Sequence, residues 1–181
     1  MNTSILSAAL GAAVLAVSLP AHALLAVGAK APDFVLPAAQ AGNQISVDSK
    51  ALRSKGPVVV YFYPAAFTPG CSVEAKLFAE AMPQFAKAGA SVIGVSGDDI
   101  TKLKKFSVSH CQGKFPVASD AGLKVAKQYE AAGAFGFAGF ASRVSYVIGQ
   151  DGKVVYAHTD SGPQGHVSES LKAVRGLVPK L

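Results

Sequence analysis

The hydrophobic pattern of the chain predicts buried strands that alternate with amphipathic helices. Residues 56–64, GPVVVYFYP, form a continuous β-branched and aromatic run, which is typical of a strand buried on both faces. Pro83 lies inside the helical pattern that follows, and we expect it to kink the helix rather than end it. That pattern consists of apolar residues at three- and four-residue intervals, which predict one buried stripe: Cys71, Ala75, Phe78, Ala79, Met82, Phe85 and Ala86.

The rest of the chain continues the alternation and closes with a hairpin. Residues 90–97 predict a second buried strand, and residues 98–111 predict a helix with an acidic first turn. The later elements are a short apolar segment at 115–118, a helix at 121–130, a loop at 131–142, a hairpin at 143–159 turned at Asp151-Gly152, and a helix at 164–177. This order predicts an α/β, thioredoxin-like three-layer fold, with a central mixed sheet flanked by helices.

The loop at 131–142 is rich in glycine, alanine and phenylalanine. Its rings at Phe135, Phe137 and Phe140 could form a substrate wall, a contact with a second chain, or a packed loop. We favour the packed loop, with a contact as the second option.

The first 23 residues differ from the rest of the chain. They contain the 15-residue apolar run ILSAALGAAVLAVSL, which is too short to span a bilayer comfortably, followed by Pro20 and the sequence Ala21-His22-Ala23. This ending fits a signal peptide (residues 1–23) cleaved after Ala23, which would export the domain at 24–181, to the periplasm in a bacterium. No lysine or arginine precedes the run, unlike the usual signal, and a membrane anchor is the alternative.

Length and composition narrow the class of protein. The chain has 181 residues, which suits one domain, and only 15% of them are charged. The net charge is +6, but the lysines are scattered, so we interpret the charge as a solubility feature and expect no nucleic-acid partner. The four histidines and two cysteines show no metal-ligand spacing, and no phosphate-binding glycine pattern occurs. We therefore expect neither a metal nor another cofactor.

The position of Cys71 bears most directly on function. Two cysteines in an exported protein most often form a structural disulfide. Cys71, however, falls in the first turn of a predicted helix, where free backbone N–H groups and the helix dipole favour a thiolate. Lowering a cysteine pKa from about 8.5 to about 6 requires roughly 3.4 kcal/mol, more than one helix terminus usually supplies. We therefore expect a further donor or cation nearby.

The residues before Cys71 suit such a site. Pro64 and Pro69 stiffen the start of the helix, and Gly70 lets the backbone approach a ligand closely. Thr68 can aim its hydroxyl into the same pocket. Each residue alone has a structural explanation, because proline in a first turn and threonine at a cap are common. Together they favour a reactive site formed around Cys71.

The same residues resemble the peroxiredoxins. PAAFTPGC, residues 64–71, matches the peroxiredoxin signature of proline, three residues, threonine, two residues and cysteine. The wider YFYPAAFTPGCSVEAKLF is similar to the Q-type, or bacterioferritin-comigratory, branch of that family. The resemblance covers nearly all of the chain after residue 23, through GAKAPDFVLP, FPVASD, GLKVAKQY and SRVSYVIGQDGKVV.

The resemblance implies a role for each residue of the motif. Cys71 would be the peroxidatic cysteine, whose thiolate attacks the O–O bond of a hydroperoxide and becomes a sulfenic acid. Thr68 would hydrogen-bond the peroxide, and the backbone N–H groups of Gly70 and Cys71 would hold its oxygens. Pro64 would shield the thiolate from water.

The resemblance also implies the missing cation. Arg143, at the start of the predicted hairpin, would stand beside Cys71 and bind a peroxide oxygen through its guanidinium fork. Without the family pattern, we would interpret Arg143 as an ordinary exposed arginine at the end of a strand. Glu74, one turn after Cys71, either orients an arginine or simply favours an early helix position.

The second cysteine, Cys111, closes the predicted helix at 98–111. Many Q-type relatives carry a resolving cysteine five residues after the first, where this chain has Lys76, and others carry it on the later helix. The resemblance therefore implies that Cys111 resolves the sulfenic acid as a disulfide. That bond requires Cα atoms within about 7 Å, so a larger separation would demand local unwinding of the first turn. We expect the neighbouring His110 to face solvent.

The implied activity is that of a thiol-dependent peroxidase. It would reduce hydrogen peroxide, organic hydroperoxides or both, and a thioredoxin-like or other thiol donor would reduce it again. By the same resemblance we expect a monomer or weak dimer. Two other functions stay open. One is a thiol–disulfide oxidoreductase, although CSVE at 71–74 lacks the second cysteine of the Cys-x-x-Cys motif. The other is a non-enzymatic binding module with a structural disulfide between Cys71 and Cys111.

Overall fold

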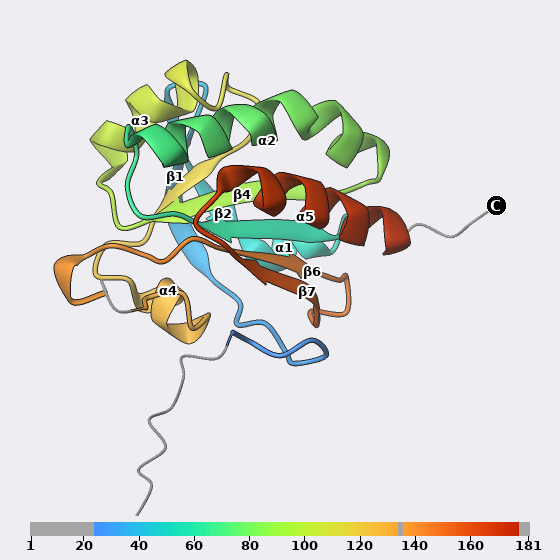
Figure 1. Cartoon of the computed structure of the whole chain (residues 1–181). Coiled ribbons are helices and arrows are strands. Elements are labelled where there is room, and N and C mark those ends of the chain that lie inside the picture. The colour runs from blue at the N-terminus through green and yellow to red at the C-terminus, as the bar shows by residue number, and fades with distance from the viewer. Residues whose placement is uncertain (1–23, 134–135, 178–181) are drawn as a thin grey trace, which may run out of the picture.

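The computed structural model, which describes residues 24–133 and 136–177, has a seven-stranded mixed sheet between two layers of helices (Figure 1). The strand order is β2-β1-β5-β4-β3-β6-β7. Strand β4 pairs in parallel with β3 and β5, and the other pairs are antiparallel. The bounds are β1 Val35–Gln40, β2 Asn43–Asp48, β3 Val58–Phe62, β4 Ser91–Ser96, β5 Val117–Ser119, β6 Val144–Ile148 and β7 Val154–Thr159. The predicted three-layer fold is confirmed.

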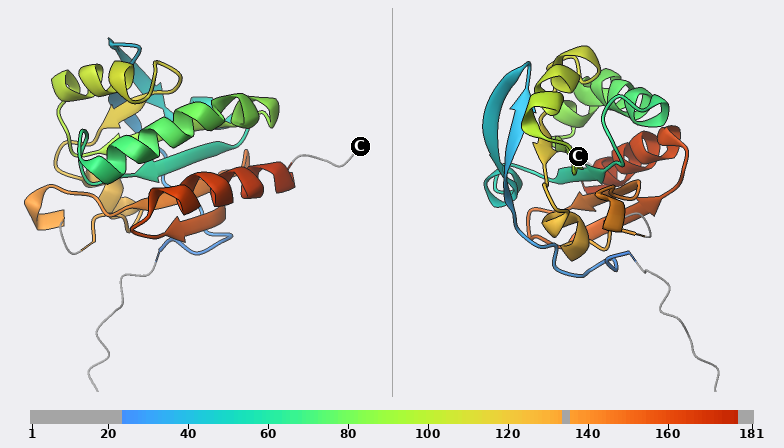
Figure 2. Two further views of the ribbon diagram at one scale, coloured as in Figure 1. Left: turned by 45° about the horizontal axis from the view of Figure 1, so that its top comes forward. Right: turned by 90° about the vertical axis from the view of Figure 1, so that its left-hand side faces the viewer.

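Three longer helices cover one face of the sheet and two short helices cover the other (Figure 2). The first layer contains α2 Pro69–Lys87, α3 Ile100–Ser109 and α5 Pro163–Leu177, and the second contains α1 Ser49–Arg53 and α4 Lys124–Gln128. A 3-10 turn, η1, spans Gly136–Ala138. None of the helices in the described ranges is both long and apolar enough to cross a membrane.

Strand β3 forms the centre of both hydrophobic cores. All five of its side chains are buried, as its continuous apolar run predicts. Successive side chains point to opposite faces of a strand, so β3 and the following Tyr63 contribute side chains to both hydrophobic cores. Val59, Tyr61 and Tyr63 pack toward α2, α3 and α5, whereas Val58, Val60 and Phe62 pack toward α4. Tyr61 stacks on Phe78 of α2 with ring centroids 4.4 Å apart. This packing fixes the start of α2 above the end of β3.

The structure corrects the predicted end of one helix and confirms two other predictions. Helix α2 continues through Pro83 to Lys87, as expected. Helix α3, however, ends at Ser109, so Cys111 lies beyond the helix rather than in its last turn. The reason is that Gln112 and Gly113 adopt positive φ values of 52° and 68°, and the Gly113 N–H donates to the Ser107 carbonyl at 2.8 Å. The predicted turn at Asp151-Gly152 does join β6 to β7.

The N-terminal hairpin formed by β1 and β2 is absent from the sequence-based prediction. Its two-residue turn, Ala41-Gly42, has positive φ values at both positions, as hairpin turns of this length require. Strand β2 reads NQISVD and buries only Val47, so it shows little hydrophobic alternation.

The loop at 131–142 packs less than expected. Phe137 is 91% exposed and Phe140 is 43% exposed, and Phe135 lies outside the described residues. The turn around Phe137 is closed by local hydrogen bonds, from Gly136 to Gly133 and from Gly139 to Gly136. The expectation of a packed loop is therefore wrong at Phe137.

Candidate active site

Helix α2 begins beyond the carboxyl end of β3, and Cys71 lies in its first turn. Figure 1 shows this helix on one face of the sheet. Pro69 occupies the first helical turn, where its missing N–H leaves no bond unmade. The first hydrogen bond of the helix runs from the Ser72 N–H to the Thr68 carbonyl at 2.9 Å. Gly70 and Cys71 come before Ser72, so their N–H groups have no acceptor within the helix. Cys71 is 1% exposed. The sulfur is therefore buried at the positive end of a 19-residue helix.

Two hydrogen bonds that involve side chains hold the loop before the helix. Thr68 takes the N-cap position, but its hydroxyl donates to the Ala65 carbonyl at 2.9 Å instead of capping the helix. The Ala66 N–H donates to the carboxylate of Asp98 at 2.7 Å. Between them Phe67 adopts a φ of 69°, a conformation that bulky residues rarely adopt. Asp98 is thus a supporting residue that sequence reasoning missed.

Arg143 lies beside Cys71, immediately before β6. The pairing of Val144 with Phe62 brings it to the end of β3. Its Nη2 lies 3.5 Å from the Cys71 sulfur, and its Nη1 donates to Oε2 of Glu74. Burial opposes the charge, but Glu74 and Cys71 favour it more strongly, so the pKa of Arg143 is raised. The expected cation therefore contacts the sulfur.

Glu74 is a buried carboxyl that orients this arginine. It has no exposed surface, and burial raises its pKa to about 8 although Arg143 acts in the opposite direction. Its second oxygen, Oε1, has no hydrogen-bond partner among the described residues. A glutamate that only favoured the start of the helix would not need this contact with Arg143.

Gly70 makes room for the guanidinium. A Cβ at this position would lie 3.0 Å from Nη2 of Arg143, closer than nine in ten such contacts. The structure thus places an arginine of the same chain against Gly70, while the close approach of a ligand stays a prediction.

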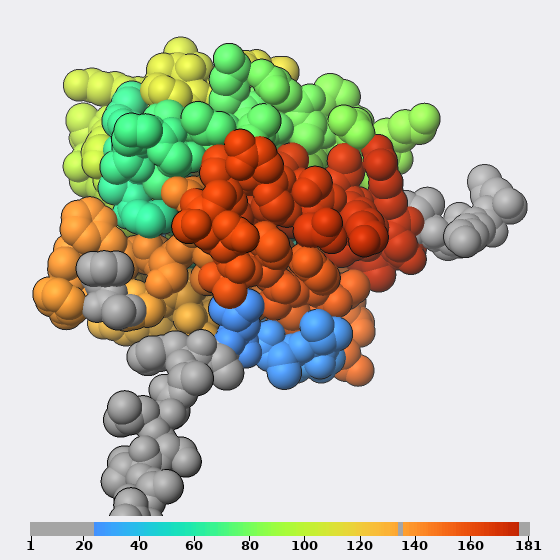
Figure 3. All heavy atoms as spheres, in the orientation of Figure 1, coloured from blue at the N-terminus to red at the C-terminus, as the bar shows by residue number. Residues whose placement is uncertain are grey.

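A pocket of about 570 Å³ opens beside Arg143, and we call it the Arg143 pocket. It brings together three separate segments of sequence: Pro64, Ala65 and Thr68 before α2; Phe140, Ala141, Ser142 and Arg143 before β6; and Thr159, Asp160 and Ser161 after β7. The space-filling view shows the teal segment before α2 next to the orange segment before β6 (Figure 3). The predicted residues Pro64, Thr68 and Arg143 thus share one wall.

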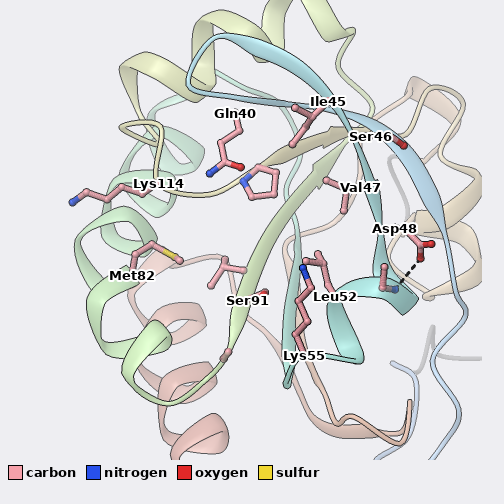
Figure 4. Close-up of a pocket in the computed structure, with 14 residues that line it drawn as sticks. Gln40, Ile45, Ser46, Val47, Asp48, Leu52, Lys55, Met82, Ser91 and Lys114 are labelled. Atoms are coloured by element: carbon pink, nitrogen blue, oxygen red, sulfur yellow. Dashed lines mark hydrogen bonds between the residues drawn. The ribbon is translucent and has the colours of Figure 1, made fainter.

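A second pocket of about 440 Å³ lies between β2, α1 and the end of α2 (Figure 4). Its lining includes Val47, Leu52, Met82 and Val92, with Lys55 and Lys114, but no cysteine or histidine. It lies by the start of β4, at the opposite end of the parallel strands from Cys71. The Arg143 pocket, by contrast, is lined by the arginine that contacts the Cys71 sulfur, so we assign the chemistry to it.

Cys111 is fully buried in the same core cluster as Cys71, and both cysteines are free thiols. Burial raises the pKa of the Cys111 thiol. The adjacent His110 stacks on Phe106 with ring centroids 5.0 Å apart and meets the edge of Phe67 at 5.4 Å. His110 is half-buried, because these two rings cover one part of it, so the expectation that it faces solvent holds in part.

Fold and site together define a thiol-based redox enzyme with its cysteine at the start of a helix. Residues 27–157 match the AhpC/TSA family. The chain is 39% identical over 152 residues to peroxiredoxin Q, chloroplastic, of Oryza sativa subsp. japonica, which covers 83% of this chain and 67% of the rice protein.

Solved structures agree. Peroxidoxin BcpB from Mycobacterium tuberculosis matches with a TM-score of 0.75 and 32% identity, covering 84% of this chain and 98% of that one. Peroxiredoxin Q from Xanthomonas campestris matches with a TM-score of 0.66 and 27% identity, covering 78% and 90%. The chain therefore belongs to the AhpC/TSA family. It is a Q-type peroxiredoxin, a thiol-dependent peroxidase.

Sequence reasoning missed the residues beneath Glu74. His166 on α5 is fully buried, and its Nδ1 lies 2.8 Å from the Ser145 hydroxyl and 3.9 Å from Oε1 of Glu74. A signal was present in the sequence, because His166 lies four residues before Ser170 and eight before Val174, on the buried stripe of the helix. The pattern alone does not show that this stripe meets a carboxyl group.

Proposed function

We propose that Cys71 is the peroxidatic cysteine of this enzyme. Its thiolate attacks the terminal oxygen of a hydroperoxide, the S–O bond forms as the O–O bond breaks, and the leaving oxygen takes a proton to become an alcohol or water. The observation that carries the proposal is the contact of Arg143 with the sulfur at 3.5 Å, on the wall of the Arg143 pocket. A guanidinium there stabilises both the anion and the charge that develops on the peroxide.

The other residues of the site act on the bound peroxide. The Thr68 hydroxyl donates to the Ala65 carbonyl, so its oxygen is left to accept the hydrogen of the peroxide O–H. The amides of Gly70 and Cys71 and the fork of Arg143 provide donors for the peroxide oxygens. Pro64 and Ala65 supply an apolar wall that limits water at the sulfur. Both hydrogen peroxide and organic hydroperoxides are candidate substrates, since the pocket has apolar and polar walls.

We also propose that Cys111 is the resolving cysteine. Its thiol attacks the Cys71 sulfenic acid, and an S–S bond forms as water leaves. Both cysteines are buried, so the step requires local opening of the segments that carry them. The contacts that must separate are those of Phe67, before α2, with Phe106 and His110, before Cys111. A thioredoxin-like or other dithiol donor then reduces the disulfide.

Mass spectrometry after one equivalent of hydrogen peroxide tests both roles. We expect the wild-type protein to form a Cys71–Cys111 disulfide. We expect Cys111→Ser to stop at a Cys71 sulfenic acid or a Cys71-linked dimer, because the resolving thiol is gone. Ser109→Ala, an exposed change at the end of α3, is the matched control and should form the normal disulfide.

Two outcomes would contradict the roles. Oxidation found first at Cys111 would assign the wrong nucleophile. A Cys111→Ser variant that cycled unchanged on dithiothreitol would remove the resolving role, since an external thiol would then suffice.

We further propose that residues 1–23 are a signal peptide and that the domain works as a periplasmic monomer or weak dimer. The support is the apolar run and the Ala21-His22-Ala23 sequence. Expression of the full chain in a Gram-negative host should give a periplasmic protein whose intact mass begins at Leu24. A full-length protein retained in the membrane fraction would instead identify an anchor. Sizing chromatography of the exported protein tests the oligomeric state.

A further inference from the structure

A buried polar cluster lies beneath Arg143, and the reaction described above does not use it. His166 of α5 is fully buried, with Nε2 3.0 Å from the Asp160 carbonyl oxygen and Nδ1 2.8 Å from the Ser145 hydroxyl. A carbonyl oxygen only accepts hydrogen bonds, so Nε2 carries the hydrogen. In the neutral ring Nδ1 is then a lone pair, which accepts the Ser145 hydroxyl. The two anchors fix both the tautomer and the orientation of the ring.

The surroundings of His166 favour this neutral form. Burial lowers the pKa of His166 to about 4, and the nearby His158 and Arg143 act in the same direction, whereas the Asp160 contacts oppose it. The His158 ring meets that of His166 edge-on at 4.7 Å. The titratable and charged groups around Glu74 and His166 come from every element packed on them: Cys71 of α2, Tyr61 of β3, Arg143 before β6, His158 of β7 and Asp160 after it.

The neutral ring faces the unpaired oxygen of Glu74. Nδ1 of His166 lies 3.9 Å from Oε1, and no described residue donates a hydrogen bond to Oε1. The lone pair of Nδ1 is already taken by the Ser145 hydroxyl, so the ring presents no N–H to Oε1. An ionised carboxylate would therefore hold a buried oxygen without a donor, which is unfavourable. The geometry suits the acid form of Glu74, in the direction of its raised pKa.

We propose that His166, anchored by Asp160 and Ser145, is a positioning residue that keeps a proton on Glu74 and thereby off Cys71. In balanced form, the Cys71 thiol and the Glu74 carboxylate become the Cys71 thiolate and the Glu74 carboxylic acid, with no change in net charge. Arg143 contacts both groups throughout. This inference rests on the proposed role of Cys71 as the nucleophile.

The shared arginine explains why the location of the proton matters. Arg143 is one positive charge between two groups that can each be negative. When Glu74 is neutral, the attraction of the guanidinium acts mainly on the sulfur. When Glu74 is ionised, the carboxylate competes for that charge and, through like-charge repulsion, disfavours the thiolate. A ring that offers no N–H donor to Oε1 therefore promotes the reactive form of Cys71.

The decisive variant is His166→Gln, which places an amide N–H donor where the ring presents no N–H to Oε1. The donor stabilises ionised Glu74, so the shared proton returns to Cys71. We expect the rate constant with hydrogen peroxide, followed by stopped flow, to fall about tenfold near pH 6.5 and to recover at alkaline pH. The midpoint of the pH–rate profile should move up by about one unit. A purely structural defect would lower the rate at every pH and leave the midpoint unchanged, which would overturn the proposal.

A second measurement does not depend on the folding of that variant. Infrared spectra of the reduced wild-type protein at pH 7 should contain the carbonyl band of a protonated carboxyl group. The band should be absent from Glu74→Gln and present in Glu80→Gln, a matched change at an exposed position of α2. Absence of the band from the wild type at pH 7 would overturn the proposal. If Cys71 failed to react with peroxide at all, the proposed function would fall, while the band would still report the protonation state of Glu74.

Discussion

Cys71→Ser is expected to reduce peroxide more slowly than the wild-type enzyme by a factor on the order of 10⁴ or more. A serine hydroxyl stays protonated at neutral pH, so Arg143 and the helix start have no anion to stabilise. The alcohol is also unable to form a reversible S–O intermediate. The measurement is the consumption of hydrogen peroxide with dithiothreitol as reductant, together with single-turnover stopped flow.

Cys111→Ser is the matched control, because it removes the other buried thiol and leaves the nucleophile in place. Its first turnover should run at close to the wild-type rate. Substantial peroxide consumption by Cys71→Ser would show that another group of the chain reacts, and the assignment of the nucleophile would be lost.

The parts of the site that are local in sequence could be predicted from the sequence. The apolar run of β3 and the stripe of α2 place Cys71 in a first helical turn without knowledge of any other element. Pro64, Thr68 and Gly70 follow from the same segment. Arg143 is 72 residues away, and only the family resemblance linked it to Cys71. Its contact depends on the antiparallel pairing of β3 with β6, which no local pattern specifies.

What the sequence did not reveal depends on long-range packing. Glu74 and His166 meet because α2 and α5 lie side by side on one face of the sheet (Figure 2). A histidine and a serine on a helical stripe look like ordinary core positions until their partners are known. The β1–β2 hairpin was missed for a different reason, since one strand is mostly exposed and polar. The end of α3 and the turns inside the loop at 131–142 depend on positive φ values, which the sequence pattern did not reveal.

Arg143→Met is expected to slow the reaction of Cys71 with hydrogen peroxide by a factor of about 10²–10³. The variant keeps much of the volume of the side chain but removes the charge beside the sulfur and the donors that face the peroxide. Arg143→Lys should lose less, because the charge remains while the fork that contacts both Glu74 and Cys71 is gone. Arg175→Met, which removes an exposed arginine of α5 bonded to Gln84, is the matched control and should leave the rate unchanged.

The same substitution should make stability more dependent on pH. Burial already raises the pKa of Glu74 from 4.5 to about 8, so the folded state prefers the protonated form, and stability falls as the pH rises through this range. Loss of Arg143 removes the contact that lowers this pKa, so the decline should extend above pH 8. Urea unfolding at pH 9 should show a loss of about 1.4 kcal/mol relative to the wild type, because the wild-type decline ends near pH 8 and that of the variant continues for a further unit. At pH 6 the loss should be much smaller, because Glu74 is then neutral in both proteins. An equal loss at the two pH values would mean that Arg143 acts through packing alone, and that Glu74 does not carry the buried charge.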